Sequence, residues 1–154
     1  MKTKDFSQIS ITELVKAANI SRAGYYNNYT NKYQILKEIV LDINSSILDD
    51  VGKPFTNQVD LEWYINLFSK VEEVSSTITL LANAGFQNDY IQIINEYIIS
   101  RSDGVNENAV CNRLIWNGGI QNIIWFWVKN GMKRCKEEMA KLCYLFLHKD
   151  KKYS

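Results

Sequence analysis

The sequence predicts an all-α protein, and three observations carry that prediction. The 154-residue chain contains one proline and seven glycines, so few residues interrupt helices, whereas a sandwich or barrel needs many turns. Its apolar fraction of 46% is large enough to bury a substantial core. Apolar residues also recur at the helical spacing i, i+3, i+4 and i+7. A late example is formed by Met139, Leu142, Cys143 and Phe146.

Charge and composition restrict the function only weakly. The formal net charge is +1, and residues 1–46 hold six Lys/Arg against four Asp/Glu, compared with 12 against 13 in the remainder. Cys111, Cys135 and Cys143 lack a CxxC spacing, so we expect small buried hydrophobes in a reducing compartment. The sequence contains no signal peptide and no long uncharged apolar run, which predicts a cytoplasmic protein without a membrane partner.

The first helix is expected to begin after Ser10. Glu13 follows three residues later, which is the spacing of a capping box in which each side chain bonds the other's free backbone N–H. Asn19 is expected to end the helix, because Asn tolerates the left-handed conformation. The apolar face is expected at Ile11, Leu14, Val15 and Ala18.

A second, very short helix is expected from Ser21, its N-cap, to about Asn28. It must be held by its neighbours, because helix nucleation is costly. Two helices joined by a turn of three or four residues form a helix-turn-helix, whose second helix enters the major groove of DNA. We expect Ile20, Ala23 and Tyr26 or Tyr29 to face inward, and Arg22, Gly24, Tyr25 and Asn28 to face outward.

A longer helix is expected from about residue 31 to 49, capped by Thr30 or Asn31. Its apolar stripe is expected at Ile35, Ile39, Ile43 and Ser46 or Ile47. The stretch 49–54 combines turn residues with the only proline, so the domain boundary is placed there. Further helices are expected at residues 59–74, 75–84, 88–101, 106–130 and 135–148.

The segment ISITELVKAANISRAGYYNNYTNKYQIL resembles the DNA-binding region of the TetR/AcrR family of bacterial transcriptional regulators. The C-terminal run IIWFWVKNGMKRCKEEMAKLCYLFL is similar to the last two helices of one subgroup, with Trp127 before the turn at Gly131. Family members carry a full helix before the matching segment, and we expect that helix to be missing or very short here. The family positions matched in the first segment are Leu14, Ala18, Ile20, Tyr26, Tyr29, Lys32 and Leu36.

The resemblance implies a helix-turn-helix DNA-binding domain over residues 1–48, followed by an all-helical ligand-binding and dimerisation domain over residues 49–154. Arg22 is the candidate for base contact, because Arg can donate two hydrogen bonds to guanine. Ser21 is first a cap and second a base contact, and Gly24 allows the backbone to approach DNA. Phosphate contacts, which supply affinity and register, are expected from Thr12, Tyr25, Tyr26, Asn28 and Lys32.

The family dimerises through its last two helices, and two interpretations of the apolar residues there stay open. They supply both core and interface, and the sequence does not divide them: Trp116, Ile120, Ile123, Trp127, Met139, Leu142, Tyr144 and Phe146. The dense aromatic set of this part either fills core and interface or lines a ligand pocket. Its members are Trp63, Phe86, Trp116, Trp125, Phe126 and Trp127.

The sequence contains no catalytic constellation, so we expect neither an enzyme nor a cofactor or metal, and His148 is expected to be a solvated tail residue. The leading hypothesis is a ligand- or partner-responsive TetR-type regulator that binds a palindromic operator in double-stranded DNA as a homodimer. The effector would be a small apolar ligand or a protein partner. The alternative is a helical protein-interaction and dimerisation module with impaired DNA binding.

Overall fold

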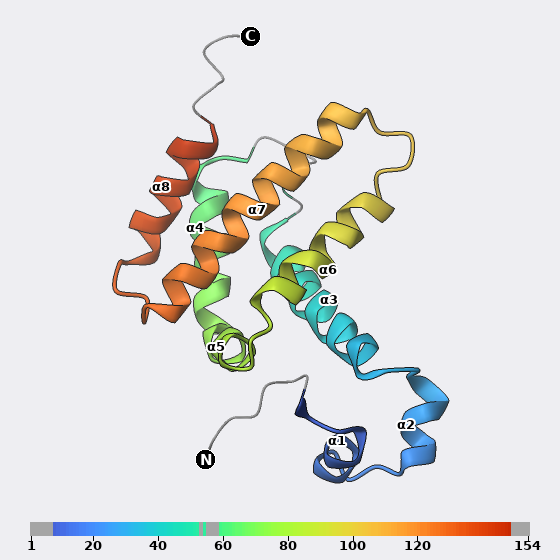
Figure 1. Cartoon of the computed structure of the whole chain (residues 1–154). Coiled ribbons are helices and arrows are strands. Elements are labelled where there is room, and N and C mark those ends of the chain that lie inside the picture. The colour runs from blue at the N-terminus through green and yellow to red at the C-terminus, as the bar shows by residue number, and fades with distance from the viewer. Residues whose placement is uncertain (1–7, 53, 55–58, 149–154) are drawn as a thin grey trace.

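The computed structural model describes residues 8–52, 54 and 59–148, and within these ranges the chain is all-helical, as predicted (Figure 1). Each helix expected from the sequence is present, with bounds that differ by a few residues. The predicted absence of a full helix before Ser10 concerns residues 1–7, which lie outside the described part. The helices are α1 (Ile11–Ala17), α2 (Arg22–Asn28), α3 (Lys32–Val51), α4 (Leu61–Glu73), α5 (Ser75–Asn83), α6 (Gln87–Ser100), α7 (Glu107–Lys129) and α8 (Lys136–Leu147).

Local capping sets the bounds of α1 and α2. The capping box of α1 is confirmed: the Ser10 backbone N–H donates to Glu13 Oε2 at 2.9 Å, and the Glu13 N–H donates to Ser10 Oγ at 3.2 Å. Asn19 ends α1 with a φ of 54°, and Ser21 Oγ accepts from the Gly24 N–H at 2.9 Å. The two helices pack against each other at the N-terminal end of α3, apart from the other helices (Figure 1).

The helix α3 connects this pair to the rest of the molecule. Its N-cap is Asn31, whose side chain accepts from the Gln34 N–H at 3.1 Å, and it ends at Gly52, whose φ is 89°. The predicted apolar stripe holds in its second half, where Ile43 packs against the core and Ile47 is buried, and is shifted by one position in its first half. The buried residues are Leu36, Val40 and Ile47, whereas Ile39 is 43% exposed.

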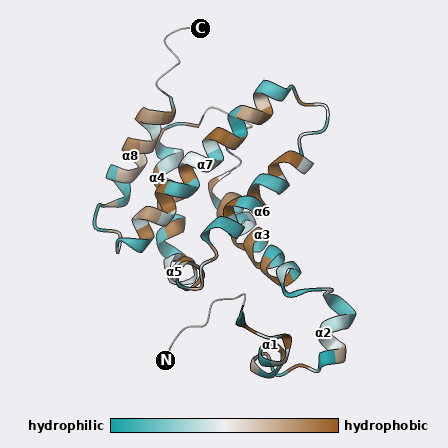
Figure 2. Cartoon of the chain, in the orientation of Figure 1, coloured by the Kyte–Doolittle hydropathy of each residue, from teal (hydrophilic) through white to brown (hydrophobic). Residues whose placement is uncertain are grey.

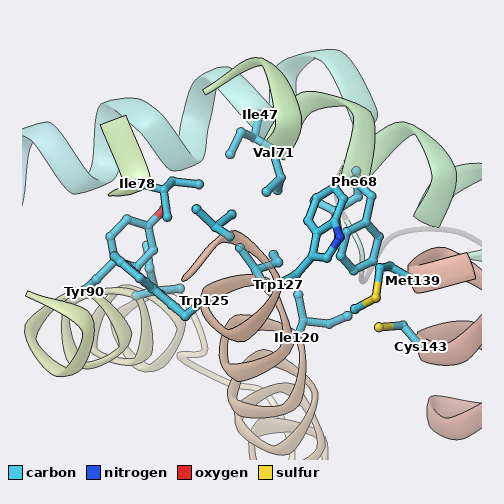
Figure 3. Close-up of a cluster of buried hydrophobic side chains, with 14 of the residues drawn as sticks. Ile47, Phe68, Val71, Ile78, Tyr90, Ile120, Trp125, Trp127, Met139 and Cys143 are labelled. Atoms are coloured by element: carbon cyan, nitrogen blue, oxygen red, sulfur yellow. The ribbon is translucent and has the colours of Figure 1, made fainter. Parts of the chain in front are cut away.

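The main core is built from side chains of all the helices from α3 to α8. Helix α4 packs against α3 and α8, and α7 packs against α5 and α6, which brings Trp125 and Trp127 of α7 into the core (Figure 3). Trp127 meets Phe68 edge-on at a centroid distance of 5.3 Å, and Trp125 meets Tyr90 in the same way at 5.5 Å. Hydrophilic and hydrophobic residues alternate around most helices, which is the pattern of amphipathic packing (Figure 2).

The structure corrects the predictions for two of the cysteines and for His148. Cys143 is buried as expected, but Cys111 and Cys135 are exposed. His148 is not a solvated tail residue: its Nε2 lies 3.3 Å from Tyr64 Oη, and its ring stacks near Tyr144 at 4.9 Å. The helix α8 runs far enough along α4 to bring residue 148 against the aromatic side chains there.

Candidate nucleic-acid interface and candidate ligand cavity

The outer side of α2 and the first turn of α1 form one candidate site. Thr12, Ser21, Arg22, Tyr26 and Asn28 are all exposed there, and the Tyr26 side chain is 53% exposed. Arg22 is the first helical residue of α2, directly after the cap at Ser21. Five of the eight residues predicted to contact DNA therefore lie on the surface of the helix pair.

The position of Tyr25 differs from the prediction. We expected it on the outer side, but it is fully buried, with its ring 5.0 Å from that of Tyr26 and 5.9 Å from that of Tyr29. Burial raises the pKa of Tyr25, and its hydroxyl has no hydrogen-bond partner among the described residues, so this buried group does not reach a phosphate. Conversely, Ile20 and Ala23 were expected inside and are exposed. The helix α2 is turned so that Tyr25 and Tyr29, four residues apart, face inward.

Lys32 and Tyr29 attach the helix pair to α3. Lys32 is partly buried, and its Nζ donates to the Ile9 carbonyl at 2.8 Å, which uses one of its three donors inside the protein. Tyr29 Oη donates to Glu38 Oε2 at 2.9 Å, and this hydrogen bond raises the pKa of Tyr29. Lys32 therefore holds the segment before α1 against α3, and Tyr29 holds the end of α2 against α3.

Gly24 and Asn28 are also engaged within α2. A Cβ added at Gly24 would lie 3.2 Å from Ser21 Oγ, the atom that caps the helix. The Asn28 side chain donates to the Gly24 carbonyl at 2.8 Å. Gly24 therefore leaves room for the cap at Ser21, in addition to any approach of its backbone to DNA.

A second candidate site is a cavity of about 420 Å³ enclosed by α3, α4, α5, α6 and α7. This volume falls in the range of small-molecule sites. Only three of the six aromatic residues considered as pocket lining from the sequence line this cavity. Trp63, Trp116 and Trp125 line it, and Trp116 Nε1 donates to Tyr64 Oη at 3.0 Å. Of the others, Phe86 and Trp127 are buried in the core and Phe126 is 65% exposed.

Sequence reasoning missed the polar residues of this cavity. Asn117 and Gln121 are 3% and 8% exposed, and both belong to the lining. The sequence feature that could have indicated them is the spacing of these two amides, four residues apart inside an apolar helical segment. Buried polar groups in such a segment need a partner.

The structure also divides the residues predicted to form a dimer interface. Ile120, Trp127 and Met139 are buried inside the subunit, so of the two open interpretations these three belong to the core. Trp116, Ile123 and Tyr144 are partly buried against the core, whereas Leu142 and Phe146 are 40% and 72% exposed. Further exposed apolar residues of the last two helices, which sequence reasoning did not nominate, are Ile115 and Leu145.

Gly118 and Gly119 are adjacent inside α7, where glycine lowers helix stability, and this pair predicts close packing against a neighbouring helix or at a dimer seam. A Cβ at Gly119 would lie 3.7 Å from Leu147 Cδ2, an ordinary contact distance, and a Cβ at Gly118 would meet nothing within 4 Å. The expected tight approach is therefore absent at both positions within the described part of the subunit.

A scan against models of known protein families finds no match to this chain, and a search of curated proteins finds none either. Across the part of the chain that the structure describes, no helix is long and apolar enough to cross a lipid bilayer. The same residues contain no group of three or more His, Cys, Asp or Glu side chains arranged to hold a metal ion.

Proposed function

We propose that this protein is a TetR-type transcriptional regulator that binds a palindromic operator in double-stranded DNA as a homodimer and responds to a ligand. The observation that carries the proposal is the pair α1 and α2. Two capped short helices are joined by residues 18–21, and the second exposes Arg22 and Tyr26 while Tyr25 is buried beneath it. This arrangement matches a helix-turn-helix, in which the second helix enters the major groove.

The exposed residues have complementary roles in this proposal. Arg22 donates to a guanine, and Thr12 and Tyr26 donate to phosphates on either side of the groove. Ser21 acts mainly as the cap of α2, because its Oγ already accepts from Gly24. Lys32 contributes positive charge near the phosphates. Tyr25 has no direct role at the DNA.

The homodimer rests on the apolar side chains that α7 and α8 expose. Phe126 on α7 and Leu142, Leu145 and Phe146 on α8 are between 40% and 72% exposed. Apolar side chains gathered on two helices are typical of an interface. A two-fold dimer then presents two copies of α2, which need half-sites about 34–36 Å apart or a multiple of that distance.

Helix α3 is the element that connects the ligand cavity to the DNA-binding pair. Its C-terminal half contributes Asn44, Ile47 and Leu48 to the cavity lining. Its N-terminal half holds the segment before α1 through Lys32 and the end of α2 through Glu38. A ligand changes DNA affinity only if it binds one position of α3 better than another.

Selection of bound sequences from a random pool of DNA duplexes tests the proposal. We expect enrichment of a palindrome, and titration of that duplex by fluorescence anisotropy should give an affinity that falls steeply with salt. Analytical ultracentrifugation of the same sample should show a dimer, which a Phe146→Lys substitution weakens. Failure to enrich any sequence at low salt, with an intact dimer, would reject DNA binding and leave the helical interaction module as the better description.

A further inference from the structure

One side of α7 carries a row of polar side chains that all line the cavity: Arg113, Asn117, Gln121 and Trp125. Each follows the previous one by four residues. Residues at this spacing lie almost above one another on a helix, with a rise of about 6 Å per step. The cavity is therefore bordered along its length by four hydrogen-bonding groups on a single wall.

Two of these groups make no hydrogen bond to a residue that the structure describes. Gln121 is 8% exposed and lines the cavity. Trp125 is 1% exposed, and its buried Nε1–H has no partner among the described residues. Asn117 donates its Nδ2 to Asn95 Oδ1 at 2.9 Å, which turns its own carbonyl toward other donors. Buried polar groups are rarely left unpaired, so this row is suited to an occupant with matching oxygen groups.

The lining that α3, α4 and α6 contribute is mostly apolar. It includes Ile47 from α3, Leu67 and Val71 from α4, and Ile94 from α6, beside the polar Asn44 of α3. An occupant must therefore have a mostly apolar body and place most of its polar atoms along one edge. A saturated acyl chain would fill the space but would leave Gln121 and Trp125 unpaired.

The charged residues of the cavity lining indicate which terminal group an occupant carries. Of the described residues that line the cavity, none is Asp or Glu, whereas Arg101 and Arg113 both belong to the lining. Arg113 donates to Ser102 Oγ at 3.2 Å, and the Arg101 guanidinium lies 5.6 Å from the centroid of the Tyr97 ring, so both lie beside the connection between α6 and α7. Arginine pairs well with carboxylate, since its N–H groups match the two oxygens.

We infer that the cavity binds an elongated organic carboxylate with a flat apolar body and carbonyl or hydroxyl oxygens along one edge. The carboxylate lies at Arg101 and Arg113, and the oxygenated edge lies along Asn117, Gln121 and Trp125. The inference rests on the proposed function in naming the effector class of the regulator, but binding to the cavity is measured without DNA.

Isothermal titration calorimetry of the full chain with three probes tests it. The probes are 4,5-dihydroxyanthraquinone-2-carboxylate, 1,8-dihydroxyanthraquinone, which lacks the carboxylate, and dodecanoate, which lacks the oxygenated edge. We expect the anthraquinone carboxylate to bind at least about tenfold more tightly than either of the other two. Arg113→Gln should remove its advantage over the neutral anthraquinone, and Gln121→Leu should weaken both anthraquinones about tenfold without weakening dodecanoate.

Gln92→Leu is the matched control, because Gln92 is exposed on α6 and does not line the cavity. Trp125→Phe provides a second variant that removes the N–H donor together with part of the ring, and circular dichroism checks that each variant is folded. Dodecanoate binding as tightly as the anthraquinone carboxylate, or no binding of any probe, overturns the inference. Operator binding without probe binding rejects this inference alone, whereas probe binding that leaves DNA affinity unchanged rejects only the coupling in the proposed function.

Discussion

Tyr29 Oη donates a hydrogen bond of 2.9 Å to Glu38 Oε2, and this contact ties the end of α2 to the second turn of α3. The buried side chains of the helix pair, Val15 and Tyr25, are not members of the main core cluster, which begins in chain order at Leu36. The orientation of α2 therefore depends on a few polar contacts with α3 rather than on a shared apolar core.

Tyr29→Phe should loosen α2 selectively. Loss of the bond to Glu38 should increase hydrogen exchange of the α2 amides, with little change in the melting temperature of the remaining helices. Mass spectrometry of exchanged peptides measures this difference. Tyr26→Phe is the matched control, because the Tyr26 side chain is 53% exposed and packs only edge-on against Tyr25. Equal exchange in both variants would show that the Tyr29 hydroxyl does not hold the helix.

Arg22→Ala should change sequence preference, whereas Tyr26→Phe should not. A bidentate contact of Arg22 with guanine implies a loss of about 1–3 kcal/mol of discrimination at one base pair. Removal of the Tyr26 hydroxyl, a phosphate donor, should weaken all sequences alike. Anisotropy titrations against the selected operator and its single-base variants measure both effects. Uniform weakening by Arg22→Ala would remove Arg22 as a base contact.

Asp60→Ala should destabilise the bundle by removing the N-cap of α4. Asp60 Oδ1 accepts from the Trp63 N–H at 2.9 Å, and loss of such a cap costs about 0.5–2 kcal/mol. Urea unfolding followed by circular dichroism measures the change. Asp103→Ala, in the exposed turn after α6, is the control and should leave the unfolding midpoint within error. A midpoint unchanged by Asp60→Ala would mean that water caps α4 equally well.

Phe68→Ala should be the most destabilising of these substitutions. Phe68 is fully buried and packs edge-on against Trp127, so its truncation leaves a cavity and should cost about 3–5 kcal/mol. Phe126→Ala removes the same side chain from a position that is 65% exposed. At concentrations low enough to keep the chain monomeric, its effect should stay below about 0.5 kcal/mol. Comparable losses would contradict the assignment of Phe126 to the surface.

Cys143 should make stability depend on pH in the alkaline range. Burial raises the pKa of its thiol to about 11, so the folded state holds the proton more tightly than the unfolded chain, where the pKa is about 8.5. This contribution is present below the unfolded pKa and is lost as pH rises through about 11. Melting temperatures between pH 8 and 11 should therefore fall more steeply for the natural chain than for Cys143→Ala.

Thiol titration gives an independent check. Cys111 and Cys135 are exposed and should react quickly with an aromatic disulfide reagent, whereas Cys143 should react only when urea unfolds the chain. Three fast thiols, or identical pH slopes for the two proteins, would contradict the burial of Cys143.

Helix bounds were predictable because they depend on neighbours in the chain. The capping box of Ser10 and Glu13, the caps at Ser21 and Asn31, and the left-handed residue Asn19 all act within a few residues. The side of each helix that faces inward was less predictable. In α3, adjacent apolar pairs such as Ile39 and Val40 allow two stripes, and only packing against α4 and α6 selects one.

The sequence by itself determined the all-helical class, the order of the helices and the local caps, because these follow from residue spacing and short-range hydrogen bonds. Tertiary structure decided that Tyr25 lies inside and Tyr26 outside, since α2 is too short for periodicity to orient it. It also decided that Gln121 and Trp125 border a cavity, and that the buried Trp125 Nε1–H has no partner among the described residues. A cavity exists only where several helices meet, and no single segment of the chain encodes it.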